Sequence, residues 1–366
     1  MSLSSWLRLL ATDGLGPART AALLEAFGSA EAVLEAAPSR LVAAGIPSKV
    51  VDALLSERSA EAAAQTESAC KRLDIAVVVR DDPRYPAPLL RAPAAPPVLF
   101  LRGDAAALSR PQVAIVGTRK AGRYGRTLAA EFAAGLARAG LAITSGLALG
   151  IDGAAHEGAL SAAGVTVAVC GTGLDTVYPP EHVDLAGRII ATGGALVSEL
   201  PPGSPPRRRN FPYRNRIIAG LALATVVVEA PRGSGALITA HHAVDAGREV
   251  LVLPGRVDNP NFSGSHALLR EGARPVTSVA DVLSELPAGV ARPPASVDER
   301  AAPRRAPPDL PAEERKLWDA LEDGPMDAAG LADLCGIALP RVLATLVRLQ
   351  MRGLVARLPG GRFERL

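Results

Sequence analysis

Residues 113–117 read VAIVG, an unbroken apolar run that ends in glycine. Five similar runs follow along the chain: LAITSG (141–146), VTVAVCG (165–171), GALVSE (194–199), TVVVEA (225–230) and EVLVLPG (249–255). Continuous apolar runs, unlike alternating ones, are typical of parallel strands that are covered on both faces. Helical patterns lie between these runs. The sequence therefore predicts an α/β fold with a Rossmann-like, doubly wound parallel sheet that ends near residue 286.

The segments on either side of this core have other patterns. Residues 1–80 carry apolar side chains at helical spacing, and GLGPART (14–20) is suited to a hairpin between two helices. Backbone N–H groups of such a hairpin can face a phosphate, although a helical packing domain explains the pattern equally well. The core is then expected at 81–286. Seven prolines between 287 and 311 predict a linker.

Residues 312–366 predict three helices followed by a hairpin, which is the element order of a winged helix. This segment contains eight basic and eight acidic residues. Its balanced charge is compatible with a protein contact at least as much as with a DNA contact.

The composition limits the class of protein. The chain has 366 residues, 48% of them hydrophobic and 21% charged, as in soluble globular proteins. No apolar run of about 18 residues predicts a membrane span, and the N-terminus lacks the pattern of a secretory signal. Cys70, Cys170 and Cys335 are far apart among apolar neighbours, which predicts buried, reduced thiols. We therefore expect a cytoplasmic protein.

Arginine is the ordinary cation of this chain, because 36 of its 40 basic residues are arginine and the net charge is only +3. Only local clusters are therefore informative. The stretch PPRRRNFPYRNR (205–216) combines five arginines with two aromatic rings and no acidic residue. Arginines along a groove, with rings on which bases stack, are how proteins hold single-stranded nucleic acid. We interpret this stretch as a loop, with a helix beginning at Arg216.

Three turns follow predicted strands. The first, Gly117-Thr118-Arg119, fits neither a dinucleotide fingerprint nor a Walker A loop, but it offers N–H groups, a hydroxyl and a guanidinium to a phosphate. The second contains Ser145 and Gly146, and the third contains Ser234, Gly235 and Thr239. The carboxyl ends of parallel strands meet at one edge of a sheet. Several phosphate-binding turns on one edge suggest a polymeric backbone as ligand.

Signals for catalysis are weak. Asp152 and His156 are four residues apart, and a helix-capping role of Asp152 explains this spacing better than a metal site does. Glu199 and Glu229 end strands, where they could act as catalytic carboxylates or hold arginines in place. No nucleophile elbow or metal-ligand spacing is present. The sequence predicts no catalytic residue, metal site or cofactor.

The motifs taken in order resemble a known family. The series IVGTR, SGLALGID, YPPEH, FPYRNRIIAGL, VVVEA, SGALITA, GREVLVLPG and SGSHALL closely resembles the DNA-processing protein A (DprA, or Smf) family, from about Tyr85 to Val276. The resemblance implies a non-catalytic DNA-binding protein with an extended Rossmann-like core. It also implies an N-terminal SAM-like, helix-hairpin-helix domain and a C-terminal winged-helix domain. Proteins of this family bind single-stranded DNA, dimerise through the core and help load the RecA recombinase during natural transformation.

The resemblance also suggests site residues. A phosphate-binding turn falls on Gly117, Thr118 and Arg119, and a DNA-contacting loop falls on Arg208, Phe211, Arg214, Asn215 and Arg216. With the strand-end residues Ser145, Gly146, Ser234, Gly235 and Thr239, these form the predicted DNA-binding set. Arg208, Thr118 and His266 stand where lysine, serine and asparagine are common in the family.

Two enzyme classes are the alternatives. The chain could be a Rossmann-type nucleotide-processing enzyme similar to the lysine-decarboxylase-like phosphoribohydrolases. However, RGSGALITA (232–240) lacks the paired glycines and downstream glutamate of their signature. A dinucleotide-dependent oxidoreductase is disfavoured because no complete glycine fingerprint occurs.

Overall fold

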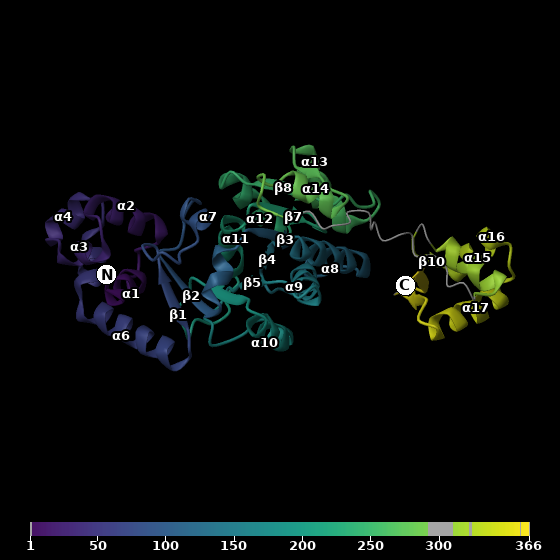
Figure 1. Ribbon diagram of the computed structural model, residues 1–366, viewed down its shortest axis with the longest axis horizontal. Coiled ribbons are helices and arrows are strands. Elements are labelled where there is room, and N and C mark those ends of the chain that lie inside the picture. Colours follow the sequence, from purple (N-terminus) through teal and green to yellow (C-terminus); the bar gives the residue numbers. More distant parts are fainter. Residues whose placement is uncertain (1, 292–309, 322–323, 359, 366) are drawn as a thin grey trace. The chain divides into compact units, whose positions relative to one another are not determined.

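The computed structural model describes residues 2–291, 310–321, 324–358 and 360–365 (Figure 1). The chain divides into two compact units, Met1–Val297 and Asp298–Leu366. Each unit has its own hydrophobic core. Most of the predicted linker at 287–311 lies outside the described residues.

The first unit begins with helices, as predicted. They are α1 (Leu3–Ala11), α2 (Pro17–Phe27), α3 (Ala30–Glu35), α4 (Pro38–Ala43), α5 (Ser48–Leu55) and α6 (Glu57–Arg72). Gly14, in the hairpin between α1 and α2, has a φ of +87°, which glycine adopts readily. Pro17 occupies the first helical position, where its missing N–H costs nothing. The predicted hairpin between two helices is therefore confirmed.

A nine-stranded sheet forms the centre of the first unit within the described residues. Its strands are β1 (Ala76–Val79), β2 (Val98–Gly103), β3 (Gln112–Val116), β4 (Ala142–Ser145), β5 (Thr166–Val169), β6 (Ala195–Ser198), β7 (Ala224–Val227), β8 (Glu249–Val252) and β9 (Arg274–Pro275). The spatial order is β1-β2-β6-β5-β4-β3-β7-β8-β9. The six predicted strands are β3 to β8, and all pairs among them are parallel.

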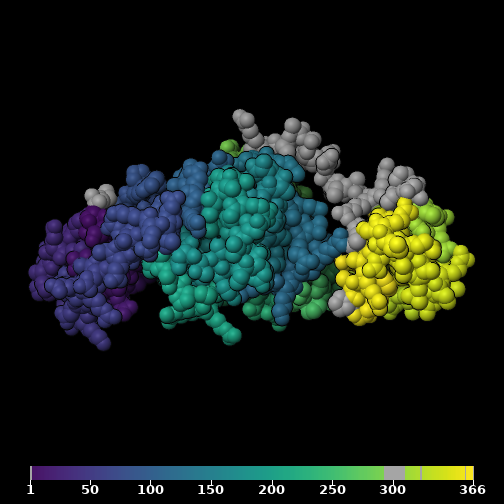
Figure 2. All heavy atoms as spheres, turned by 90° about the horizontal axis from the view of Figure 1, so that it is seen from below, coloured from purple at the N-terminus to yellow at the C-terminus, as the bar shows by residue number. Residues whose placement is uncertain are grey.

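The sheet is mixed, because β1 and β2 pair antiparallel with each other and β2 pairs antiparallel with β6. These two strands were not predicted, since β1 lies in the segment that was expected to be helical and the short apolar run of β2 follows a proline-rich stretch at 83–97. β1 lies before the predicted domain boundary at residue 81. One hydrophobic cluster joins Trp6 of α1 with Phe100 of β2 and Leu196 of β6. The N-terminal helices therefore pack directly against the core (Figure 2).

Helices cover both faces of the parallel strands. They are α7 (Ala87–Leu90), α8 (Arg123–Arg138), α9 (Ile151–Ser161), α10 (Val183–Ala191), α11 (Asn210–Leu221), α12 (Gly235–Asp245), α13 (Ser263–Arg270) and α14 (Val279–Ser284), with short 3-10 turns at Ala105–Ser109, Pro180–His182 and Pro260–Phe262. Alternate residues of β3 enter opposite cores: Val113 and Ile115 contact the α8 and α9 side, and Ala114 and Val116 the α11 and α12 side. The doubly wound prediction is confirmed.

The strand order places a topological switch point between β3 and β7. From β3 the chain moves outward through β4, β5 and β6, and it then returns to place β7 on the other side of β3. The loops after two such neighbouring strands leave in opposite directions and open a crevice at their carboxyl ends. The fold therefore directs a ligand to the turns that follow Val116 and Val227.

The second unit is a winged helix, as predicted. It comprises α15 (Ala312–Ala320), β10 (Met326–Asp327), α16 (Ala328–Cys335), α17 (Leu339–Met351), β11 (Val355–Arg357) and β12 (Arg362–Arg365). The strands pair in the order β10-β12-β11. Trp318, Leu346 and Phe363 meet in its core.

Two predictions from composition can be compared with the structure. Cys70, Cys170 and Cys335 are buried and form no disulfide, as predicted. In the part of the chain that the structure describes, no single helix has the length and apolar character needed to cross a membrane, whereas the bent pair α16 and α17 has them only when taken together.

His156 of α9 is fully buried and predicts a pH dependence of folding. Its Nδ1 lies 2.7 Å from Oγ1 of Thr166, whose hydroxyl donates to the carbonyl of Ile143. Nδ1–H is therefore the donor, and Nε2 is buried without a partner among the described residues. Burial lowers the pKa of His156 from 6.5 to about 3, and the nearby His182 and Arg214 act in the same direction.

Between those two values the unfolded state binds a proton that the folded imidazole excludes, so stability falls as pH is lowered through this window. We expect about 2 kcal/mol of loss from His156 alone between pH 7 and pH 5. The measurement is denaturant unfolding at both pH values, followed by Trp6 fluorescence in a Trp318→Phe background. His156→Gln is the control and should lose less stability by that amount. Equal losses in the two proteins would contradict the assignment.

Candidate nucleic-acid interface

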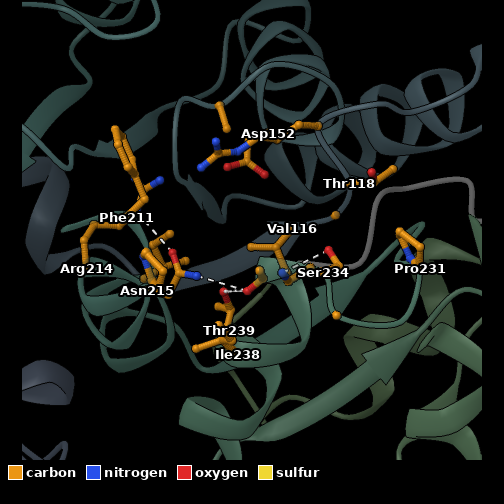
Figure 3. A pocket seen from close by; sticks show the side chains of 18 of the residues that line it. Val116, Thr118, Asp152, Phe211, Arg214, Asn215, Pro231, Ser234, Ile238 and Thr239 are labelled. Atoms are coloured by element: carbon orange, nitrogen blue, oxygen red, sulfur yellow. Dashed lines mark hydrogen bonds between the residues drawn. The ribbon is translucent and has the colours of Figure 1, made fainter. Parts of the chain in front are cut away.

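A cavity of about 760 Å³ opens at the switch point (Figure 3). Its walls come from the turn after β3, the turn after β7, the start of α9, Tyr178 and the segment 208–218. Ten of the thirteen residues of the predicted DNA-binding set line this cavity: Gly117, Thr118, Arg119, Arg208, Phe211, Arg214, Asn215, Ser234, Gly235 and Thr239. The fold thus brings together three segments that are far apart in sequence.

The turn after β3 is held by backbone contacts. The N–H of Thr118 donates to the carbonyl of Glu229 at 2.7 Å, and the carbonyl of Thr118 accepts from Ile151 at 3.2 Å. A Cβ at Gly117 would lie only 2.4 Å from a side-chain carbon of Ile151, so this position requires glycine. The backbone of the turn is therefore fixed against β7 and α9. The exposed side chain of Arg119 extends from this rigid backbone.

The turn after β7 leads into α12, where the Ser234 side chain caps the helix by accepting from Ala236 N–H at 3.2 Å. The carbonyl of Gly235 accepts from Asn215 Nδ2 at 3.0 Å and from Thr239 Oγ1 at 3.3 Å (Figure 3). Asn215 thereby ties α11 to α12. Its amide is engaged in this bond, which makes it a structural link within the wall of the cavity.

The predicted loop at 205–216 is wrong in its second half, because α11 begins at Asn210 and not at Arg216. Pro212 does not prevent this, since the N–H groups of the first helical turn have no partner within the helix. The helical phase has a direct consequence. Phe211 faces the cavity, Arg214 and Asn215 are buried within its wall, and Arg216 is buried and does not line it.

Phe211 lies in an aromatic and cationic layer. Its ring centroid is 5.3 Å from the ring of Tyr178 and 5.3 Å from the Arg119 guanidinium. A Cβ at Gly171 would come within 2.8 Å of the Phe211 ring, so glycine lets the ring rest on the backbone after β5. Tyr178 was not among the predicted residues, because its YPPEH segment is distant in sequence and carries no charge pattern of its own.

Three exposed arginines surround the cavity, each from a different segment: Arg119, Arg208 and Arg232. Among the residues that the structure describes, none of their guanidinium groups forms an ion pair with a carboxylate, in contrast to Arg216. Arg232 was not predicted, since a single arginine carries little information in an arginine-rich chain. The three cations give the rim a positive character that suits a polyanion.

The buried side chains of Arg214 and Asp152 lie on either side of Gly146, and each bonds to its backbone. Arg214 Nη1 donates to the carbonyl of Gly146 at 2.7 Å, and Asp152 Oδ2 accepts the N–H of Gly146 at 3.1 Å. Burial raises the pKa of Asp152, and the nearby guanidinium of Arg214 opposes this rise. The predicted capping role of Asp152 is wrong, because Gly150 is the N-cap of α9. Instead, the bond from Arg214 to Gly146 connects α11 to the turn after β4, and the bond from Gly146 to Asp152 connects this turn to α9.

Three residues of the predicted set do not line the cavity. Ser145 is fully buried and its hydroxyl donates to the carbonyl of Ile115 at 2.6 Å. Gly146 lies behind Arg214 and Asp152. Arg216 pairs with Glu199 at 2.5 Å, and its guanidinium lies 4.2 Å from the Tyr213 ring centroid. Because all three residues contact the interior of the core, we no longer include them among the residues expected to contact DNA.

The two glutamates considered for catalysis are engaged in structural contacts. Glu199 pairs with Arg216. Glu229 is buried and accepts from the N–H of Gly122 at 3.4 Å and from the side chain of Asn261. Within the described residues, no three His, Cys, Asp or Glu side chains are grouped so that they could hold a metal ion.

Comparison with known proteins gives the same family over all three parts of the chain. A family model described as DNA recombination-mediator protein A matches residues 76–287. Models described as the DprA winged helix domain and the DprA-like N-terminal HHH domain match residues 301–361 and 2–64. Protein Smf of Escherichia coli is 41% identical over 286 residues, which are 78% of this chain and 76% of that protein.

Two solved structures are similar to this chain. DNA processing protein A from Streptococcus pneumoniae matches with a TM-score of 0.67 and 34% identity over 78% of this chain and 98% of that chain. DNA processing protein A from Helicobacter pylori, whose structure concerns its single-stranded DNA binding mode, matches with a TM-score of 0.52 and 28% identity over 57% of this chain and 94% of that chain. The chain belongs to the DNA recombination-mediator protein A family, the DprA or Smf proteins.

Proposed function

We propose that this protein binds single-stranded DNA in the cavity at the β3–β7 switch point. The observation that carries the proposal is that the exposed Arg119, Arg208 and Arg232 line the same cavity as the Phe211 ring, with Arg119 lying against that ring. A ring beside several cations provides stacking for a base and charge for the flanking phosphates. The Helicobacter pylori relative, whose structure concerns the binding of single-stranded DNA, supports the same assignment.

The rigid turn after β3 positions a phosphate contact next to the stacking surface. Arg119 is close enough to Phe211 to interact with its ring, so a phosphate bound by Arg119 lies beside a base stacked on that ring. Ser234 and Gly235 supply the N-terminal end of α12, an 11-residue helix whose dipole favours negative charge. These contacts involve the DNA backbone and one base face, so we expect little preference for sequence.

The direct test is a competition between single- and double-stranded DNA of equal length for the full chain. We expect unpaired DNA to compete at least tenfold better, because a base in a duplex is not available to Phe211. Equal competition by the two forms would contradict the proposal.

The proposed role is a recombination mediator in the cytoplasm that protects incoming single strands and helps load the RecA recombinase during natural transformation. The family supports this assignment, and dimerisation through the Rossmann-like core belongs to the same proposal. The measurement is RecA filament formation on coated single strands with and without this protein. A rate that does not change on its addition would contradict the mediator role while leaving DNA binding untouched.

The proposed role includes no catalytic step. Glu199 and Glu229, the two carboxylates considered for catalysis, are bound to structural partners, and Glu229 is also buried. Steady release of free base from a nucleoside monophosphate, lost in a Glu229→Gln variant, would contradict this part of the proposal.

The salt dependence of DNA affinity reports how many phosphates the exposed arginines contact. For single strands, each neutralised phosphate contributes about −0.7 to the slope of log affinity against log salt. We therefore expect Arg119→Ala, Arg208→Ala and Arg232→Ala each to make the slope shallower by about 0.7. The measurement is the dissociation constant of a fluorescent oligonucleotide between low and moderate salt.

Arg315→Ala, in the winged-helix unit, is the matched control and should leave the slope unchanged. A slope that stays constant in all three cavity variants would show that these arginines do not contact phosphates.

A further inference from the structure

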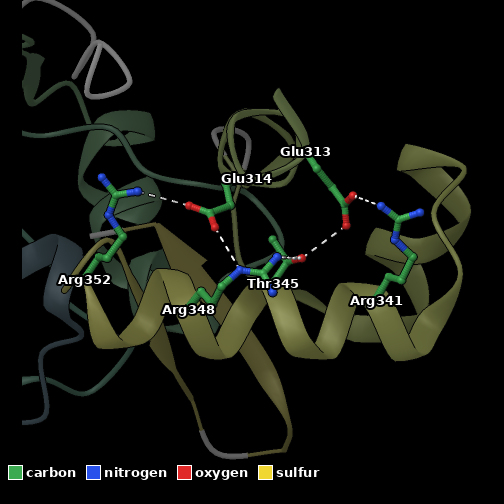
Figure 4. Close-up of polar contacts among 6 residues, drawn as sticks. All are labelled: Glu313, Glu314, Arg341, Thr345, Arg348 and Arg352. Carbon is green, nitrogen blue, oxygen red and sulfur yellow. Dashed lines mark hydrogen bonds and ion pairs between the residues drawn. The ribbon is translucent and has the colours of Figure 1, made fainter. Parts of the chain in front are cut away.

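Helix α17 of the winged helix uses its arginines within its own domain (Figure 4). Arg348 Nε donates to Glu314 at 2.9 Å and Arg352 Nη1 donates to the same carboxylate at 3.2 Å. Arg341 pairs with Glu313, which also accepts from Thr345 Oγ1 at 3.2 Å. These contacts fasten α17 to α15. In a helix-turn-helix protein that reads DNA, this second helix enters the major groove, and here its cations already face carboxylates.

The outward side of α17 is apolar. Leu339, Leu343, Val347 and Met351 are 43%, 46%, 55% and 84% exposed, and their spacing of four residues forms one continuous stripe. We call these four residues the α17 stripe. Pro340 and Ala344 border it, and Gln350 is the polar residue closest to it in the helical projection. The stripe carries no group that could contact a phosphate.

The opposite side of the same helix is apolar as well, because Val342, Leu346 and Leu349 are buried in the domain core. Apart from its arginine row, α17 is therefore hydrophobic nearly all round. Helices of this composition are normally covered on both sides. Exposed apolar patches with a continuous shape mark interaction sites. The geometry indicates that the α17 stripe is covered by protein.

We propose that the α17 stripe packs against the α17 stripe of a second copy of this chain. The two helices are antiparallel, and the two-fold axis that relates them passes at the height of Thr345 along the helix. In this arrangement Leu343 of one copy lies opposite the partner's Val347, and Leu339 lies opposite the partner's Met351. Rows of side chains four residues apart interdigitate when two helices pack at the commonest crossing angle, about −50°.

Charge favours a copy of the same chain as the occupant. A two-fold contact brings each residue near its own equivalent, so a charged patch would repel itself. The α17 stripe contains no charge and is therefore compatible with its own copy. The arginine row Arg341, Arg348 and Arg352 lies beside the stripe and is neutralised by Glu313 and Glu314.

The contact is small, since the stripe extends only about 18 Å along the helix. A patch of this size gives a weak interface when two free domains meet. If the cores dimerise, as we propose above, the two winged helices are tethered at an effective concentration that reaches the millimolar range. The stripe contact would then form within the dimer. The stripe contact therefore rests on the proposed core dimer but not on DNA binding, and the mass of the full chain in solution, measured by light scattering, tests that dimer separately.

The experiment is thiol cross-linking of the full chain with a short bis-maleimide. A Val347→Cys variant places a thiol in the centre of the stripe, while Cys70, Cys170 and Cys335 are buried. Asp319→Cys, on an exposed position of α15 in the same domain, is the matched control. We expect the covalent two-chain product to form at least tenfold faster with Val347→Cys than with the control.

A second variant distinguishes a specific contact from chance encounter. Adding Leu343→Glu to Val347→Cys introduces a buried acid at the contact and should lower the cross-linking rate to that of the control. Circular dichroism checks that the domain remains folded, as expected for a substitution at an exposed site.

Two results would overturn the proposal. Equal cross-linking rates for Val347→Cys and Asp319→Cys would show that the stripe is not a contact between copies. A tenfold loss of DNA affinity on Leu343→Glu, with cross-linking at the level of the control, would assign the stripe to DNA.

Discussion

Replacing Phe211 with alanine is expected to weaken single-stranded DNA binding by about 5- to 150-fold, which corresponds to the 1–3 kcal/mol of one base stacked on an aromatic ring. The ring faces the cavity, between Tyr178 and the Arg119 guanidinium. Alanine removes the stacking surface and leaves the three exposed arginines in place. Affinity should therefore fall while the salt dependence stays nearly constant. Fluorescence anisotropy with a short oligonucleotide measures both quantities.

Tyr213→Ala is the matched control, because Tyr213 lies two residues away on the same helix, is exposed and does not line the cavity. Its ring contacts the Arg216 guanidinium. We expect less than a threefold change in affinity from this substitution. If both alanine variants bind DNA as tightly as the unmodified chain, bases do not stack on α11 and the proposed site is wrong.

Phe211→Trp extends the same test. A larger ring keeps a stacking surface, so we expect affinity within about threefold of the unmodified chain. The variant should also report binding directly, since a stacked base quenches indole fluorescence. Loss of affinity in the tryptophan variant equal to that in the alanine variant would indicate that Phe211 supports the shape of the cavity and does not contact a base.

The parallel core was predictable because its signal is local. Each of β3 to β8 is a short, continuous apolar run, and the return from β6 to β7 follows the usual winding of such sheets. β1 and β2 were missed because they are short, pair antiparallel at one end of the sheet and are separated by a proline-rich stretch. The position of these two strands in the sheet depends on the pairing of β2 with β6, and no local sequence pattern reveals this pairing.

The two turns that line the cavity could be predicted from the sequence, whereas the orientation of the side chains on α11 could not. Glycines and hydroxyl residues after β3 and β7 mark the two turns that line the cavity. The roles of Arg214 and Arg216 depend on where α11 begins, because each residue advances the helix by about 100°. With a start at Asn210, both side chains point into the core. Unless the first residue of the helix is known, a sequence does not show whether an arginine is buried in the core or exposed to contact a phosphate.

The second large effect is on stability. Arg214→Met is expected to lower the free energy of unfolding of the first unit by about 3–5 kcal/mol, because it leaves the carboxylate of Asp152 buried without its cation. The guanidinium also bonds to the carbonyl of Gly146, which would lose this partner. The measurement is denaturant unfolding followed by Trp6 fluorescence in a Trp318→Phe background, so that only the first unit is observed. Arg209→Met, an exposed position on the same segment, should change stability by less than about 0.5 kcal/mol.

A double substitution separates the electrostatic interaction of Arg214 with Asp152 from simple loss of packing. If Asp152 is costly only because its cation is gone, Arg214→Met combined with Asp152→Asn should be more stable than Arg214→Met alone, by about 1–3 kcal/mol. The amide side chain still provides an oxygen for the N–H of Gly146 and carries no charge. If the two substitutions simply add, the residues do not interact. Additive losses would therefore contradict the predicted charge interaction between Arg214 and Asp152.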